Sequence, residues 1–248
     1  MTIGGERPRA ITDILLAADI HLADSFPDRA QAFFLFLHKQ ARQAQALYLL
    51  GDLFDRWPGD DDDDETATET RRELSALVAA GIGVYVQRGN RDFLLGKRFA
   101  RDTGCTLIGD THVLTVGERR LLLMHGDTLC DDKAHKRYRL GRSLLIPALA
   151  AFMPLARRRN LAAWMQEQSS SSRQPVKISK QTAIFSLRQN RCQTLIHGHL
   201  HAPGEETWQD GKDTFIRICL SDWEFKGGYV KINTINGEIS NQTATITT

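Results

Sequence analysis

Five short polar clusters, each following an apolar run, hold the side chains of this chain that could do chemistry. They are Asp19-Ile20-His21, Gly51-Asp52, Gly89-Asn90-Arg91-Asp92, His125-Gly126-Asp127 and His197-Gly198-His199-Leu200-His201. Carboxylate, imidazole and amide oxygen donors together suit divalent cations of hard to borderline character. Since apolar runs that stop at polar residues are typical of buried strands, these donors would arrive from five strand ends. The sequence therefore predicts a hydrolase with a pair of metal ions.

The first two clusters are weak signals when taken alone. Asp19 and His21 are two residues apart, so on a strand their side chains would point to the same side and reach one cation. A structural role is equally compatible with this pair. Asp52 follows Gly51, which lets the backbone approach closely, so the Asp52 carboxylate could bridge two metals.

The third and fourth clusters each have an ordinary structural alternative. The side-chain oxygen of Asn90 could bind a metal while its amide donates to a phosphate. The alternative is an Asx turn before a helix that Asp92 caps, and both can hold at once. A lone histidine after a strand, such as His125, is more often structural, and only its context suggests a metal ligand.

The H-G-H-x-H cluster is the most specific of the five. Three imidazoles within five residues are rarely tolerated in a buried loop unless a metal or a phosphate uses them. On an extended backbone His199 and His201 would point the same way, and we expect these two to be ligands. His197 shares their parity, so geometry does not exclude it, but we expect it to support the ligands.

The first half of the chain alternates strands and helices. The expected strands are 14–18, 46–50 and 84–86, and the expected helices are 30–43, 66–80 (ended by Gly81) and 92–102. The acidic run 60–64 is expected to be a solvated loop before a helix. This βαβ pattern predicts a parallel sheet with right-handed crossovers.

From residue 106 the pattern changes to hairpins. Turn signals at Gly117-Glu118, Asp210-Gly211 and Asn236-Gly237 predict a second, more antiparallel sheet. An Arg-rich, mostly helical segment, 131–186, would interrupt this sheet as a cap. We therefore expect a single catalytic domain, with its core formed by residues 1–130 and 187–248.

The bulk composition limits the class of protein. A chain of 248 residues with 42% hydrophobic residues can bury a full core, and a net charge of +2 does not suggest a nucleic-acid partner. The four cysteines stand singly and are expected to be reduced and mostly buried. The longest apolar stretch, 144–156, is shorter than the roughly 20 residues that cross a bilayer. The first ten residues lack the apolar core of a secretory signal, so a cytoplasmic protein is expected.

Taken jointly, the order D-x-H, G-D, G-N-x-D, H-G, G-H-x-H resembles the calcineurin-like metallophosphoesterases. That resemblance implies an α/β fold, a four-layer αββα sandwich of two mixed sheets. It also implies two divalent cations, most commonly Mn²⁺, bridged by Asp52. The implied ligands are Asp19, His21, Asp52 and His201 for one cation, and Asp52, Asn90, His125 and His199 for the other. Two cations about 3.5 to 4 Å apart can lower the pKa of a shared water and neutralise charge on a phosphoryl group. Nitrogen and oxygen ligands alone do not choose between Mn, Fe and Zn.

The residue type at position 91 limits the class of substrate that we expect. Many members of the family have a histidine after the asparagine, where it is thought to protonate an alkoxide leaving group. A guanidinium, with a pKa above about 12, donates protons poorly but clamps phosphate well. Loss of the acid is tolerable when the leaving group is a phosphate, whose second pKa is about 6. Arg91, with Asn90 as the second catalytic residue, therefore favours cleavage of a pyrophosphate.

The residues around three clusters, 48–57, 89–100 and 124–130, resemble the members of that family that act on a UDP-linked acylated glucosamine in the lipid A pathway of Gram-negative bacteria. This resemblance covers residues 13 to about 232. It implies attack of a metal-bridging water on the α-phosphorus, with UMP and 2,3-diacylglucosamine 1-phosphate as products. It further implies a peripheral enzyme on the cytoplasmic face of the inner membrane. The oligomeric state is left open.

The cap composition is compatible with a lipid substrate. Residues 144–165 combine apolar side chains with Arg142 and Arg157 to Arg159, which could wrap acyl chains, rest on anionic headgroups and steer an anionic substrate. The alternative is a helical hairpin with a solvated basic face. The family's cap motifs align poorly here, with His135 at a position that usually holds tyrosine. The expected substrate contacts are Asn90, Arg91, Asp132, Ser169, Arg173, Lys177 and His199.

Two other functions remain as alternatives. One is a metallophosphodiesterase or pyrophosphatase acting on a soluble nucleotide, which would not need the apolar cap. The other is a non-catalytic binding module on the same fold. Retention of all seven expected ligands argues against the second.

Overall fold

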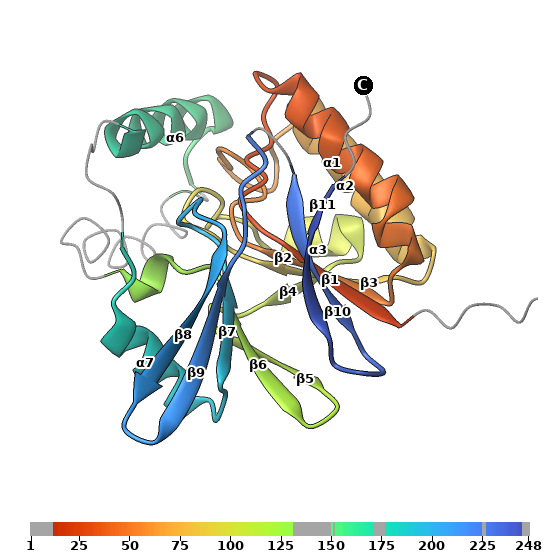
Figure 1. The fold of residues 1–248 in the computed structure, drawn as a ribbon. Coiled ribbons are helices and arrows are strands. Elements are labelled where there is room, and N and C mark those ends of the chain that lie inside the picture. The colour runs from red at the N-terminus through yellow and green to blue at the C-terminus, as the bar shows by residue number, and fades with distance from the viewer. Residues whose placement is uncertain (1–11, 131–149, 151, 171–176, 225–226, 245–248) are drawn as a thin grey trace, which may run out of the picture.

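The computed structural model describes residues 12–130, 150, 152–170, 177–224 and 227–244, which form two mixed sheets with helices outside them (Figure 1). Across the first sheet the strands are β11 (Ile239–Thr243), β10 (Gly228–Asn233), β1 (Asp13–Ala17), β2 (Ala46–Leu50), β3 (Gly83–Gln87) and β4 (Thr106–Ile108). Across the second they are β5 (His112–Val116), β6 (Arg119–Met124), β7 (Thr194–His197), β9 (Asp213–Cys219) and β8 (Gly204–Asp210).

Parallel strands form the centre of each sheet. β1 to β4 are parallel to one another, and β6, β7 and β9 are parallel in the second sheet. The predicted hairpins at Gly117 and Gly211 join β5 to β6 and β8 to β9 at the two edges of the second sheet. The carboxyl ends of the central strands in both sheets therefore carry the loops that hold the polar clusters.

Three apolar cores separate the layers. The inner core lies between the sheets, where Leu16 and Ile232 face Leu121 and Ile196. The outer face of the first sheet is covered by α1 (Pro27–Lys39), α2 (Glu65–Ala79) and α3 (Lys97–Thr103), and α7 (Lys180–Gln189) covers the second. A short 3-10 turn, Ala41–Gln43, follows α1, and another, Asp127–Leu129, follows β6. The four-layer αββα arrangement is as predicted, and all four cysteines are buried and unpaired.

The hairpin at Asn236-Gly237 was expected in the second sheet, and that expectation was wrong. Its strands β10 and β11 extend the first sheet, where β10 pairs antiparallel with β1. Val230 and Ile232 then face the inner core, packed with residues of β1. A turn signal identifies a hairpin, but it does not say which sheet the hairpin joins.

The helix expected over residues 92–102 begins only at Lys97, so Asp92 does not cap it. The Asp92 carboxylate instead accepts hydrogen bonds from the backbone N–H groups of Gly89 (2.6 Å) and Leu53 (2.7 Å). The start of α3 is capped by Asp60, whose two oxygens accept from the N–H groups of Gly96, Arg98 and Phe99 at 2.9 to 3.0 Å. A carboxylate distant in sequence therefore supplies the cap.

The rest of the acidic run is not simply solvated, as had been expected, but binds α6 (Leu155–Ser170). Arg158 of α6 donates to both oxygens of Asp61 (2.7 and 2.5 Å) and to the carbonyl of Pro58 (2.8 Å). Arg159 pairs with Asp62, Asp63 and Asp64 at 2.5 to 2.6 Å. These ion pairs attach the described helix of the expected cap to the loop after β2.

The other expected boundaries were close to the structure. α1 begins at Pro27, earlier than expected, because a proline fits the first turn of a helix, and α2 ends just before Gly81, which has the left-handed φ of +89°. α7 crosses the expected end of the cap at residue 186 and packs on the second sheet. No helix among the described residues is long and apolar enough to cross a membrane.

Candidate metal centre

The five polar clusters follow strands from both sheets and come together. Asp19 and His21 follow β1, and Asp52 and Asn90 follow β2 and β3. His125 directly follows β6, and the histidine cluster begins on the last residue of β7. Their side chains form two groups that could each hold a metal ion: Asp19, His21 and His201, and Asp52, His125 and His199.

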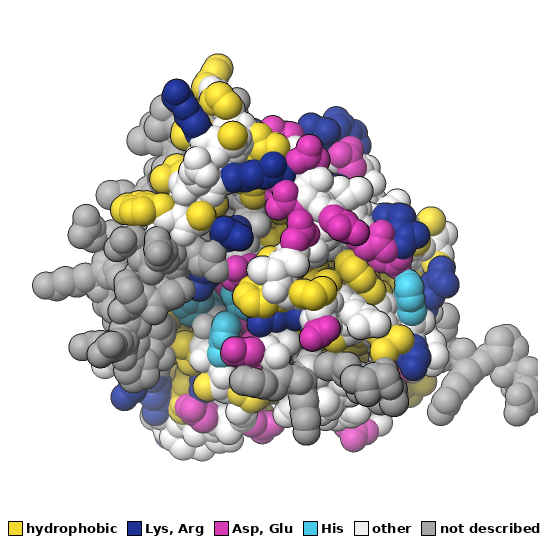
Figure 2. All heavy atoms as spheres, turned by 90° about the horizontal axis from the view of Figure 1, so that it is seen from above, with side chains coloured by type: hydrophobic (Ala, Val, Ile, Leu, Met, Phe, Trp, Pro, Cys, Tyr) yellow, Lys and Arg dark blue, Asp and Glu magenta, His cyan; other side chains and the backbone are white. Residues whose placement is uncertain are grey.

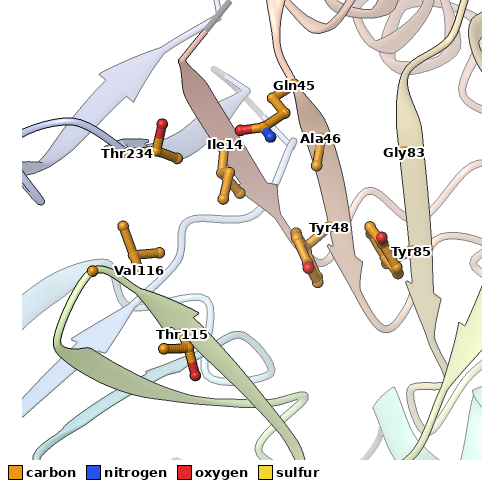
Figure 3. Close-up of a pocket in the computed structure, with 10 residues that line it drawn as sticks. Ile14, Gln45, Ala46, Tyr48, Gly83, Tyr85, Thr115, Val116 and Thr234 are labelled. Atoms are coloured by element: carbon orange, nitrogen blue, oxygen red, sulfur yellow. The ribbon is translucent and has the colours of Figure 1, made fainter.

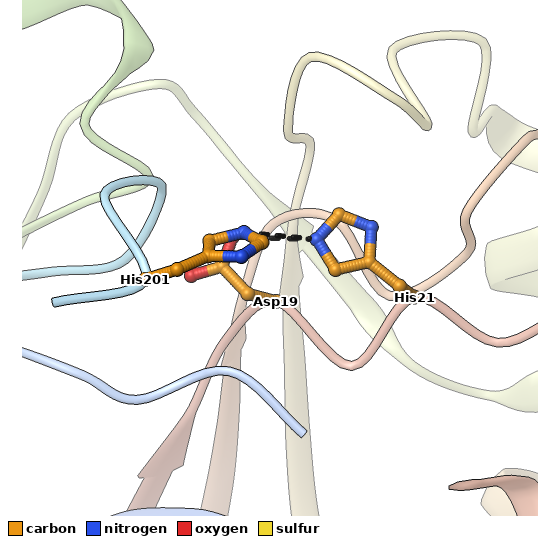
Figure 4. Close-up of side chains that lie close together, drawn as sticks. All are labelled: Asp19, His21 and His201. Carbon is orange, nitrogen blue, oxygen red and sulfur yellow. Dashed lines mark hydrogen bonds and ion pairs between the residues drawn. The ribbon is translucent and has the colours of Figure 1, made fainter. Parts of the chain in front are cut away.

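In the first group, the rings of His21 and His201 point toward one another beside the Asp19 carboxylate (Figure 4). The Nε2 atoms of His21 and His201 are 3.2 Å apart, and they lie 3.9 and 3.7 Å from Oδ1 of Asp19. Ligand atoms that bind one ion at about 2.1 Å are themselves about 3.0 to 3.5 Å apart. The spacing and the donor types therefore fit a divalent cation between the three side chains.

The second group is built around a fully buried histidine. Nε2 of His125 lies 3.6 Å from Oδ2 of Asp52 and 3.0 Å from Oδ1 of Asn90, and its ring meets that of His199 edge to face at 5.0 Å. The same Oδ2 of Asp52 lies 3.9 Å from Nε2 of His21 in the first group. Asp52 thus lies between the two groups, where one carboxylate can serve both.

The backbone at these residues is strained. Five of the seven expected ligands have a left-handed backbone, with φ of 54° at Asp19, 52° at His21, 52° at Asp52, 68° at His199 and 51° at His201. Each such residue costs about 1–2 kcal/mol relative to the right-handed form. Hydrogen bonds between the loops offset this cost: the N–H of Asp19 donates to the carbonyl of Gly51 (3.1 Å), and that of His199 to Oδ2 of Asp19 (2.7 Å).

This conformation corrects one step of the sequence reasoning. His199 and His201 were expected to point the same way from an extended backbone. Because both have positive φ, their side chains separate, and His201 joins the first group while His199 joins the second. The ring of His197 is buried, belongs to neither group and contacts Nε of Arg217 (2.9 Å), so its supporting role stays a prediction.

Two glycines are required by close packing at the centre. Gly51 has φ of +86°, and a Cβ there would lie 2.5 Å from Nδ1 of His125. A Cβ on Gly198 would lie 2.4 Å from Oδ2 of Asp19. The expected close approach of the backbone at Gly51 is therefore present, and it makes room for the imidazole of His125.

Two carboxylates that the sequence reasoning missed lie behind the histidines. Nδ1 of His201 is 3.0 Å from Oδ2 of Asp222, and Nδ1 of His21 is 3.6 Å from Oδ1 of Asp55. Carboxylates in these positions orient a histidine and raise its basicity. Asp55, in the run G-D-L-F-D, could have been suspected from its proximity to Asp52, whereas nothing near Asp222 in the sequence signals it.

Charge and burial set the protonation of the centre without metal. Burial lowers the pKa of His125, but the carboxylates of Asp52, Asp19 and Asp127 overcome this and raise it to about 9. Burial also lowers the pKa of His201, but the carboxylates of Asp19 and Asp222 outweigh this effect and raise it to about 10. Burial raises the pKa of Asp19, yet the three neighbouring histidines bring it down to about 2. Asp127 thus acts on His125 electrostatically.

Binding of divalent cations should therefore release protons. At pH 7, below the raised pKa values of about 9 and 10, both His125 and His201 carry a proton that a metal must displace. We expect release of about two protons when both groups fill, and an affinity that rises with pH until it reaches those pKa values. Calorimetric titration with Mn²⁺ at pH 7, in buffers of different ionisation enthalpy, measures the release. Binding without proton release would contradict this charge assignment.

Arg91 lies beside the two groups. Its backbone N–H donates to Oδ1 of Asp52 (2.7 Å), and Nη1 of its guanidinium is buried and has no hydrogen-bond partner among the described residues. Burial raises the pKa of Asp55, but His21 and then the charge of Arg91 outweigh this effect, so the pKa of Asp55 is lowered. A guanidinium with an unused donor at this point could bind an anionic oxygen.

The structure describes only two of the four substrate contacts that the sequence predicts from the cap. Asp132 and Arg173 lie outside the described residues, and Ser169 belongs to the last turn of α6. Lys177 is exposed, one residue before the bridge between Ile178 and Cys130. These residues stay predictions.

A pocket of about 450 Å³ lies at the opposite end of the sandwich (Figure 3). It is lined by the first residues of β2 and β3, Ala46 and Gly83, and by Val116 at the turn after β5. The stacked rings of Tyr48 and Tyr85, 4.5 Å apart, form part of its wall. The clustered metal-type donors follow the carboxyl ends of the same strands, so this pocket is separate from them.

The fold and the paired donor groups are those of a known class. The calcineurin-like phosphoesterase family matches residues 12–203, and the chain belongs to that family. Within it, the chain is 38% identical over 232 residues to UDP-2,3-diacylglucosamine hydrolase of Salmonella paratyphi B, covering 91% of this chain and 97% of that protein. It is 39% identical over 233 residues to the protein of the same name in Salmonella arizonae, with the same coverage. Among solved structures, it is similar to an archaeal phosphodiesterase with a TM-score of 0.47 and 12% identity, over 93% of this chain and 99% of that one.

Proposed function

We propose that this protein hydrolyses the pyrophosphate bond of UDP-2,3-diacylglucosamine by attack of water on the α-phosphorus, giving UMP and 2,3-diacylglucosamine 1-phosphate. The observation that carries the proposal is the placement of Arg91 beside two metal-type donor groups that share Asp52. The names of the relatives, which match nearly the whole chain, support the same substrate. Such a reaction would belong to lipid A biosynthesis.

The donor sets fit two divalent cations, for which we propose Mn²⁺. Asp19, His21, Asp52 and His201 would hold one, and Asp52, Asn90, His125 and His199 the other. When bound, such ions activate water and neutralise charge on the phosphoryl group. Asp222 and Asp55 would hold the rings of His201 and His21 in the orientation that binding needs.

Arg91 and Asn90 would position the substrate. The Arg91 guanidinium can take two phosphate oxygens at once, and its fixed charge offsets charge that develops as the bond to the leaving phosphate breaks. The amide of Asn90 can donate to the same group while its oxygen faces His125. No proton donor is needed, because the departing sugar phosphate is stable as an anion.

We further propose that the described part of the cap faces the lipid and a cytoplasmic membrane surface. Phe152 is 90% exposed, Trp164 of α6 is 57% exposed and Leu161 is 42% exposed, with the exposed Arg157 nearby on the same helix. Figure 2 looks down on this side and shows hydrophobic and basic side chains at the edge of a face that also carries histidines. Arg158 and Arg159 would contribute less to attracting an anionic substrate, since their charges are paired with aspartates.

Release of UMP from UDP-2,3-diacylglucosamine tests the proposed reaction directly. We expect release that depends on added Mn²⁺, that a chelator abolishes and that His125→Ala loses. Running the reaction in ¹⁸O-labelled water should place the label in UMP, because attack is at the α-phosphorus. Absence of UMP, or label in the sugar phosphate alone, would contradict the proposal.

Replacing an exposed apolar side chain of α6 should separate the acylated substrate from a soluble nucleotide. For Trp164→Asp we expect KM for the acylated substrate to rise about 10-fold or more, since burial of such a ring contributes about 1.5–3 kcal/mol. Phe185→Asp on α7, which removes another exposed ring (63% exposed) on a different helix, is the matched control and should leave KM unchanged. Equal KM in both variants would favour the soluble-nucleotide alternative.

A further inference from the structure

A buried arginine lies behind the histidine cluster, at a position that the sequence reasoning did not single out. Arg217, on β9, is only 6% exposed, and its Nη1 pairs with Oε1 of Glu206 on the neighbouring strand β8 at 2.7 Å. Its Nε donates to Nε2 of His197 at 2.9 Å. Burying a guanidinium is costly unless its donors are used, so this contact needs an explanation.

The contact determines which nitrogen of His197 carries the proton. An arginine side chain can only donate, so Nε2 of His197 must accept and cannot itself hold a proton. The remaining nitrogen, Nδ1, then carries the hydrogen and donates it to the carbonyl of Gly198 at 2.6 Å. The imidazole is thereby neutral and fixed in one tautomer.

The Gly198 carbonyl is the start of the turn that presents two expected ligands. The same oxygen accepts the N–H of Leu200 at 2.9 Å, which closes the turn around His199. On the other side of this glycine, its N–H donates to the carbonyl of His125 at 2.9 Å. His199 and His201 hold strained, left-handed backbones in this turn, which persist only if neighbouring groups enforce them.

We propose that Arg217 is a positioning residue for the metal centre: through His197 it fixes the turn that places His199 in one donor group and His201 in the other. Because the turn serves both groups, loss of Arg217 should weaken both cation sites and not one. Glu206 completes the arrangement by balancing the buried charge. The inference rests on the proposed metal centre but not on the proposed substrate, so it can be tested with Mn²⁺ alone.

The first test uses the unaltered protein. Ring nitrogen NMR shifts of His197, assigned by their loss in His197→Gln, should show a proton on Nδ1 and none on Nε2. A proton on Nε2 would overturn the proposal, because the link from Arg217 to the turn would not exist.

The second test is calorimetric titration of Arg217→Met with Mn²⁺. Loss of a direct partner of a metal-binding histidine typically weakens metal affinity 10- to 100-fold. Arg217 acts one step further out, through His197, so we expect a loss at the lower end of that range, about 10-fold, at both sites. Arg188→Met is the matched control, since Arg188 on α7 pairs with Asp210 and Asp213 away from the centre, and its Mn²⁺ affinities should stay within about twofold of the unaltered protein. Arg217→Lys, which keeps the charge, should recover part of the affinity.

A merely structural role gives a different result. In that case Arg217→Met would lower the melting temperature while both Mn²⁺ affinities stayed unchanged, and the proposal would be wrong. Weakening of one site only would also overturn it. If Arg217→Met does not fold, Arg217→Lys and the tautomer measurement decide the matter. Failure to release UMP would leave these Mn²⁺ results unaffected, so the two proposals fail independently.

Discussion

Asp52→Ala should remove metal from both donor groups and abolish hydrolysis. Its Oδ2 lies 3.6 Å from Nε2 of His125 and 3.9 Å from Nε2 of His21, so the substitution takes one ligand from each group at once. Metal ions contribute several kcal/mol to phosphoryl transfer, and each 1.4 kcal/mol is tenfold in rate. We therefore expect turnover to fall by at least about 1,000-fold.

Elemental analysis and UMP release together measure this effect. The unaltered protein should carry about two Mn²⁺ per chain, and Asp52→Ala should carry less than one after desalting. Asp213→Ala is a suitable control, because this carboxylate is 58% exposed and pairs with Arg188 far from the centre. Retention of both metals by Asp52→Ala, or turnover within about tenfold of the unaltered protein, would show that the two groups do not depend on a shared Asp52.

In the metal-free protein, the same substitution should lower the pKa values of Asp92 and His125, because the Asp52 charge raises both. Burial and the neighbouring Asp52 charge raise the pKa of Asp92 to about 6, although backbone N–H groups of Gly89 and Leu53 oppose this. Asp52 also helps to hold the pKa of His125 near 9. The cost of gathering these carboxylates is compensated by protons on the histidines in the metal-free protein, and by cations in the loaded one.

The apolar and polar pattern was sufficient to locate the donors, but only the family resemblance, and not their spacing, assigned them to the two groups that the structure contains. Apolar runs ending at Asp19, Gly51 and His125 identified strand ends correctly, because buried parallel strands leave a continuous apolar signature. Which histidine serves which group depends on the left-handed backbones of His199 and His201. Strain of this kind is imposed by tertiary contacts, so neither propensity nor spacing predicts it.

Polar contacts between residues distant in sequence are the other feature that the sequence did not predict. Asp60 caps α3 from 36 residues away in sequence, and Asp92, the local candidate, is used to hold two backbone N–H groups near Asp52. Asp222 reaches His201 from the segment after β9. A carboxylate has no sequence periodicity that reveals its partner, whereas an apolar side chain does.

Arg91→Ala should keep both metals and lose most of the turnover. Arg91 contributes a backbone N–H, not a side chain, to Asp52 (2.7 Å), so the donor groups do not depend on its guanidinium. The buried Nη1, without a hydrogen-bond partner among the described residues, is free to bind a phosphate oxygen. A hydrogen bond to a charged group contributes about 1.5–3 kcal/mol, which for two parallel bonds predicts a loss of about 100-fold or more in kcat/KM.

Two further variants distinguish paired hydrogen bonding by the Arg91 guanidinium from the effect of its positive charge alone. Arg91→Lys keeps the charge but not the paired donors, so we expect it to recover only part of the lost kcat/KM. Arg91→His would place an ionisable proton donor at this position, and it should raise the rate on an alkyl phosphate ester relative to the pyrophosphate. Equal losses on both substrates in Arg91→Ala, with no change of preference in Arg91→His, would mean that leaving-group chemistry does not explain the arginine. Loss of Mn²⁺ from Arg91→Ala would instead assign it to the metal centre itself.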